Sequence, residues 1–98
     1  MLLLGPFSVA ANAKDLIGRA STWNKEFSLL FIDNPVGVGF SFTQSTDGYV
    51  RDEYHVGRDL YSFITQFFTI FNQYSKNDFY IAGESYAGTS YISSLIES

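Results

Sequence analysis

The chain has 98 residues and a formal net charge of -4, and 46% of its residues are hydrophobic while 16% are charged. With 18% aromatic residues, this composition is too rich in core-forming side chains for an intrinsically disordered segment. The six Lys and Arg residues form no cluster, which argues against a nucleic-acid partner. One histidine and no cysteine argue against a metal site or a disulfide framework, and nothing in the sequence indicates a cofactor.

The chain opens on an apolar run, Met1 to Leu4, that ends at Gly5-Pro6. This run is too short for the apolar part of a signal peptide or for a membrane span, so the sequence shows no targeting signal and predicts no membrane partner. A mature domain rarely begins inside an apolar run, and we therefore expect the chain to be an internal piece of a longer protein. Residues 7–10 predict a short strand and residues 11–26 a loop.

Residues 27–33, FSLLFID, form a continuous apolar run of strand length. Such a run is typical of a strand that is buried on both faces of a parallel sheet. The segment that follows contains Pro35, Gly37 and Gly39, which predict a loop where the backbone must bend or approach another group closely. We expect Asp33 and this loop to have structural roles.

Apolar residues recur at steps of three and four from Asp52 onward, which predicts an amphipathic helix of about six turns. Either Asp52 or Asp47 is expected to cap its start, and His55 is expected to be a surface or capping residue. The apolar face consists of Val56, Leu60, Phe63, Ile64, Phe67, Phe68, Phe71 and Tyr74.

A polar turn over residues 75–78 precedes a second apolar run, residues 79–82, which predicts another buried strand. The turn at 83–88 comes next, and the apolar residues of 91–96 fit one helical face. Strands that alternate with helices predict an α/β fold with a parallel sheet and right-handed crossovers. Residues 1–98 are expected to be part of one such domain.

Ser85 lies three residues after the second predicted strand, between Gly83 and Gly88. Ligands of open α/β sheets bind at the carboxyl ends of the strands, and a sharp strand-to-helix turn there exposes a serine Oγ. The pattern Gly-x-Ser-x-Gly is not met literally, because Ala87 stands where the second glycine would be. The turn alone is therefore compatible with a solvated serine or with a nucleophile.

The segment IAGESYAG, residues 81–88, is similar to the active-site signature of the serine carboxypeptidases. The segment STWNKEFSLLFIDNPVGVGFSF, residues 21–42, resembles the same family's stretch of a tryptophan, an apolar strand, and then Asp, Pro, Val, Gly, Phe and Ser. The helix GRDLYSFITQFF and the run NDFYIAGESYAG follow in the family's order, most closely that of its vitellogenic-like branch. The resemblance covers almost the whole chain.

This resemblance implies an α/β-hydrolase fold, secretion or delivery to a lysosome or vacuole, and release of C-terminal residues from peptides at acidic pH. Ser85 would be the nucleophile, the backbone N–H of Tyr86 an oxyanion donor, and Glu84 a ligand of the substrate's terminal carboxylate. Gly83 and Gly88 would shape the turn around the nucleophile. Because two carboxylates repel, Glu84 can bind such a substrate only while one proton is shared, so binding would weaken as the pH rises. The alternative for Glu84 is a solvent-facing turn residue.

The chain also departs from the family pattern. No Asp or His follows Ser85 to complete a catalytic triad. The family's Asn-Gly-Gly-Pro-Gly loop, which in the family precedes the segment LLLGPF, is absent from this sequence. Leu3 stands where the family commonly has a glutamate, and residues 89–93 differ in spacing. Three interpretations stay open: a piece of a serine carboxypeptidase that is active at full length, a truncated non-catalytic remnant, or an acyltransferase-like or esterase-like relative. The sequence leaves the oligomeric state open.

Overall fold

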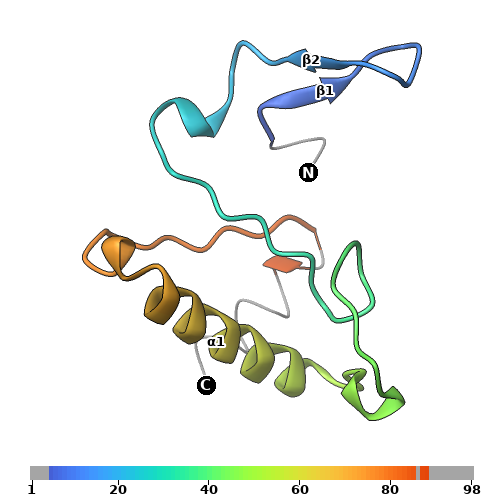
Figure 1. Cartoon of the computed structure of the whole chain (residues 1–98), viewed down its shortest axis with the longest axis vertical. Coiled ribbons are helices and arrows are strands. Elements are labelled where there is room, and N and C mark those ends of the chain that lie inside the picture. Colours follow the sequence, from blue (N-terminus) through green and yellow to red (C-terminus); the bar gives the residue numbers. More distant parts are fainter. Residues whose placement is uncertain (1–4, 86, 89–98) are drawn as a thin grey trace. The chain divides into compact units, whose positions relative to one another are not determined.

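The computed structural model describes residues 5–85 and 87–88, and it divides the chain into two compact units, Met1–Ile32 and Asp33–Ser98. The first unit contains the strands β1, Phe7–Val9, and β2, Leu16–Gly18 (Figure 1). The second contains the helix α1, Glu53–Ile70. Three short 3-10 helices complete the described elements: η1 at Trp23–Lys25, η2 at Thr46–Gly48 and η3 at Asn72–Tyr74.

Strands β1 and β2 form an antiparallel hairpin in which Ser8 lies opposite Ile17. The side-chain oxygen of Asn12 closes the turn, because it accepts hydrogen bonds from the backbone N–H of Lys14 at 3.0 Å and of Asp15 at 3.3 Å. The strand predicted over residues 7–10 is thus confirmed, whereas the prediction of a continuous loop over 11–26 is wrong at β2. A strand of three residues is too short to show a periodic pattern, and its partner lies next to it in the sequence.

The two buried strands predicted over residues 27–33 and 79–82 are not formed within the described residues. The sheet of the described residues consists of β1 and β2, and neither segment takes part in it. Their side chains are also not buried, as Phe27, Tyr80 and Ile81 are 58%, 80% and 44% exposed. A buried parallel strand needs neighbours on its edges and layers on its faces, and the described part of the chain supplies neither. The predicted parallel sheet is therefore not confirmed.

Helix α1 follows the apolar pattern closely, although it has 18 residues, about five turns instead of six. It ends at Ile70. The next residue, Phe71, caps it by donating its backbone N–H to the Phe67 carbonyl oxygen at 2.8 Å, and η3 continues the chain to Tyr74. Val56 on this helix is 4% exposed and is the buried hydrophobic residue of the described structure. No helix within the described residues is long and apolar enough to cross a membrane.

Aromatic side chains link the end of α1 to the segment after η3. The ring centroids of Phe67 and Phe71 lie 4.9 Å apart, and Phe68 meets Phe79 edge to face at 5.2 Å. Such contacts stabilise a fold beyond the area that they bury. The contact between Phe68 and Phe79 joins the segment that leads to Ser85 to the C-terminal end of the helix.

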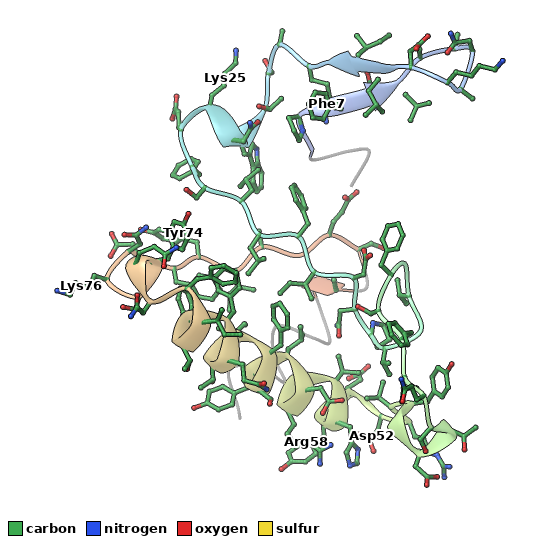
Figure 2. All side chains as sticks on the ribbon, viewed as in Figure 1. Phe7, Lys25, Asp52, Arg58, Tyr74 and Lys76 are labelled. Carbon is green, nitrogen blue, oxygen red and sulfur yellow. The ribbon has the colours of Figure 1, made fainter. Side chains whose placement is uncertain are left out.

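Of the two residues expected as caps, Asp52 caps the start of α1, whereas Asp47 lies in η2. Figure 2 shows Asp52 at this end of the helix with Arg58 further along. Its Oδ1 accepts the backbone N–H of His55 at 2.9 Å and lies 2.6 Å from the His55 ring Nδ1. The backbone hydrogen bond, and then the ring hydrogen bond, lower the pKa of Asp52 below its usual value of 3.8.

Asp52→Asn replaces the capping carboxylate by an uncharged amide, and it therefore tests how much the charge of the cap contributes to stability. A lowered pKa in the folded state stabilises the protein above the unfolded value of 3.8, and this stabilisation is lost as the pH falls through the folded value. The melting temperature of the unmodified protein should therefore exceed that of the variant at pH about 5 and above, with the difference disappearing at lower pH. Thermal melts followed by circular dichroism test this, and a pH-independent difference would contradict it.

Candidate active site

The turn around Ser85 has a strained backbone. Ser85 has a φ of +58°, in the left-handed region that residues other than glycine seldom adopt. The turn is closed by the backbone N–H of Gly88, which donates to the Ser85 carbonyl oxygen at 3.0 Å, and by that of Ala87, which donates to Glu84 at 3.3 Å. Strained residues of this kind are typical of functional sites. A nucleophile elbow has its serine on such a turn between a strand and a helix, and of these parts the described residues show the turn.

Gly83 and Gly88 come close together in this turn. A Cβ atom on Gly88 would lie 3.4 Å from the Gly83 carbonyl oxygen, which is an ordinary van der Waals contact. The turn that the two glycines flank in the sequence is thus formed, and its hydrogen bonds join Ser85 to Gly88 and Glu84 to Ala87, while the role of the glycines themselves stays a prediction. Ser85 and Glu84 are both exposed, so solvent and small molecules reach the hydroxyl and the carboxylate.

The described residues provide Ser85 with no general base. The hydroxyl has no hydrogen-bond partner among them, and His55, the single histidine of the chain, is paired with Asp52 at the start of α1. A serine hydroxyl without a base stays protonated and is a weak nucleophile. Tyr86, the expected oxyanion donor, lies outside the described residues, as do Leu3 and residues 89–93. Within residues 5–85 and 87–88 there is no group of three or more potential metal ligands.

The Asp33–Ser41 loop, residues 33 to 41, follows the first apolar run and is held together by its own hydrogen bonds. The Asp33 carboxylate accepts the backbone N–H of Phe40 at 3.0 Å, and the Ser41 hydroxyl donates to the Asp33 carbonyl oxygen at 2.6 Å. Gly37 donates its N–H to the Ser41 carbonyl oxygen at 2.8 Å. Gly37 and Gly39 have φ values of +95° and +56°. The structural role expected for this loop is confirmed, but its anchoring by Asp33 was not evident from the sequence.

Residues 2–98 match the sequence profile of the family described as "Serine carboxypeptidase". The chain belongs to the serine carboxypeptidase family. The match extends over both structural units and includes the turn with Ser85.

Several named relatives are similar to this chain over 84 residues, or 86% of its length. Identity is 54% with "Venom serine carboxypeptidase" of Apis mellifera, 55% with "Probable serine carboxypeptidase CPVL" of Homo sapiens and 49% with "Vitellogenic carboxypeptidase" of Aedes aegypti. The matched part is 17–18% of the length of these relatives. The family resemblance seen in the sequence, including its vitellogenic-like branch, is thereby confirmed.

Proposed function

We propose that Ser85 is the nucleophile of a serine-type carboxypeptidase that releases C-terminal residues from peptides, and that this activity belongs to the full-length protein. The observation that carries the proposal is the left-handed φ of +58° at Ser85 inside the Gly83–Gly88 turn. A residue held in this conformation needs surrounding structure that compensates for the strain. Membership of the serine carboxypeptidase family supports the assignment.

In this proposal residues 1–98 are part of one α/β-hydrolase domain. The apolar runs at 27–33 and 79–82 become parallel strands when the neighbouring strands of that domain pair with their edges, and α1 is the crossover between them. The backbone N–H of Tyr86 donates to the oxyanion, and the triad Asp and His come from other parts of the full-length protein. The hydroxyl of Ser85 then gives its proton to the histidine as it attacks the scissile carbonyl carbon.

The substrates are the C-termini of peptides or proteins, and Glu84 binds their terminal carboxylate through a shared proton. Binding of this kind favours acidic compartments, so we place the protein in the secretory pathway, either released from the cell or delivered to a lysosome or vacuole. The names of two relatives, a venom and a vitellogenic carboxypeptidase, are in line with such a location. The scarcity and scatter of Lys and Arg give no support to a nucleic-acid partner.

The first experiment is expression of the longest open reading frame that contains these 98 residues. The purified protein is incubated with N-blocked dipeptides, and the release of the C-terminal amino acid is measured at pH 4 to 8, about the range in which a shared carboxyl proton is lost. Release would support the carboxypeptidase. A protein that transfers the acyl group to an alcohol or amine acceptor would instead be an acyltransferase, and a protein with neither activity would be a non-catalytic remnant.

Replacement of Glu84 by glutamine is expected to change the pH dependence of substrate binding. In the unmodified enzyme the KM for a free C-terminal carboxylate should rise with pH as the shared proton is lost, whereas the glutamine amide keeps its protons at every pH. The KM of Glu84→Gln should therefore be nearly constant with pH. Dipeptide amides, which lack the carboxylate, are the control, and an unchanged pH profile for the acid substrates would remove Glu84 from the binding site.

A further inference from the structure

Phe40 is the most exposed of the large hydrophobic residues in the described structure, at 95%. Other phenylalanines of the same unit contact a second ring, as Phe67 does with Phe71 and Phe68 with Phe79. Phe40 makes no such ring contact within residues 5–85 and 87–88. Among the described residues its ring is thus open to solvent.

The backbone at Phe40 is nevertheless fixed. Its N–H donates to the Asp33 carboxylate. The same carboxylate lies so close to Gly39, the residue before Phe40, that a Cβ atom at position 39 would overlap it. These interactions lie inside the loop and need no other part of the chain. Because this backbone is already ordered, a partner that binds the ring has to order only the ring's own side-chain torsions, and such preorganisation of the backbone raises affinity.

The position of the loop relates it to the proposed active site. The loop begins where the first apolar run ends, and the turn with Ser85 begins where the second ends, with α1 between them in the chain. In the α/β domain proposed above, a parallel strand, a crossover helix and a second parallel strand place both carboxyl ends on one edge of the sheet. Ligands bind at this edge, and the loops there carry specificity.

We propose that Phe40 is a specificity-determining residue, whose ring forms an apolar wall for one of the two substrate side chains that flank the scissile peptide bond. This inference rests on the proposed function. It predicts that the preferred substrates carry an aromatic or large aliphatic side chain at that position. Asp33 is then a positioning residue, because it acts on substrate only by fixing the backbone of Phe40.

The test uses the full-length protein and four N-blocked dipeptides: Phe-Phe, Phe-Ala, Ala-Phe and Ala-Ala. We expect Phe40→Ala to reduce the preference for Phe over Ala, expressed as a ratio of kcat/KM values, by about tenfold at one of the two positions. Phe40→Leu, which keeps an apolar side chain, should retain most of this preference. Ile70→Ala is the matched control. Ile70 is also a large exposed apolar residue, at 72%, but it is the last residue of α1 and lies outside the Asp33–Ser41 loop.

Four kcat/KM ratios express the preference for Phe over Ala, two at each substrate position. If Phe40→Ala leaves these four ratios unchanged while the unmodified protein releases C-terminal residues in a Ser85-dependent way, the proposed function stands and this inference is wrong. If Phe40→Ala fails to fold, or melts far below Ile70→Ala with unchanged ratios, the ring packs in the core of the full protein and the inference is also wrong. An unmodified protein that releases nothing overturns the proposed function and this inference together.

Discussion

Replacing Ser85 by alanine in the full-length protein is expected to lower the release of C-terminal residues by about 10⁴-fold or more, since removal of a triad nucleophile leaves only binding and oxyanion stabilisation. The same substitution should abolish labelling by a fluorophosphonate probe, which reacts with activated serines. Both losses are expected without a change in fold, because Ser85 is exposed and its hydroxyl has no hydrogen-bond partner within the described residues.

Ser62→Ala is the matched control for this experiment. Ser62 is an exposed serine on α1 whose hydroxyl accepts a hydrogen bond from the Gln66 side chain at 3.0 Å. This variant should be labelled by the probe and should release amino acids at the unmodified rate. If Ser85→Ala retained activity equal to Ser62→Ala, Ser85 would not be the nucleophile and the carboxypeptidase mechanism proposed above would be wrong.

Gly39→Ala is expected to have a large effect on stability, a loss of about 2.5 to 3.5 kcal/mol in the free energy of unfolding. Its φ of +56° disfavours any residue with a Cβ by roughly 1–2 kcal/mol. The new Cβ would also overlap the Asp33 carboxylate. The carboxylate would have to move, and its hydrogen bond to the Phe40 N–H, worth about 1.5 kcal/mol, would be lost.

Gly18→Ala provides the comparison for this substitution. A Cβ on Gly18 would meet no atom within 4 Å, and its φ does not lie in the left-handed region. We expect a change of at most about 0.5 kcal/mol there, as for ordinary surface substitutions. Chemical denaturation of both full-length variants measures the difference, and equal midpoints would mean that the Asp33–Ser41 loop is not as rigid as its hydrogen bonds indicate.

The start of α1 could be predicted from the sequence because its signals are local. Asp52 offers a side-chain acceptor to the free N–H groups of the first turn, and Val56 and Leu60 begin the apolar face. The predicted end was less accurate, since the apolar residues Phe71 and Tyr74 continue the pattern through a 3-10 turn that lies beyond the last α-helical residue. A side-chain pattern does not distinguish these two helical geometries at a helix end.

The strands could not be predicted in the same way, because a strand depends on its partners. An apolar run such as Phe27 to Asp33 indicates that the segment tends to be buried, but pairing requires neighbours that the described residues do not contain. The short strand β2 has the opposite property, since its partner β1 is close in sequence while its three residues carry no pattern. In both segments the presence or absence of a pairing partner, and not residue composition alone, determines whether a strand forms.

Gly83 and Gly88 predict a turn around Ser85, and the left-handed φ of Ser85 and the hydrogen bonds from Ala87 and Gly88 agree with a turn there. The anchoring role of Asp33 was missed. Its carboxylate reaches seven residues along the chain to the Phe40 N–H, and such a contact depends on the left-handed backbone at Gly37 and Gly39. A sequence pattern indicates that a loop bends at its glycines, but it does not indicate which side chain will meet the backbone after the bend.

The position of the single tryptophan has a practical consequence for spectroscopy. Trp23 lies in η1, in the first unit, and is 53% exposed, whereas α1, the long helix of the described residues, lies in the second unit. In a sample of these 98 residues, the fluorescence emission of Trp23 therefore reports on the first unit, which contains the hairpin. The ellipticity at the helical minimum reports mainly on the second unit, which contains α1. Coincident melting curves from the two signals would indicate one cooperative transition, and separate curves would indicate that the units unfold independently.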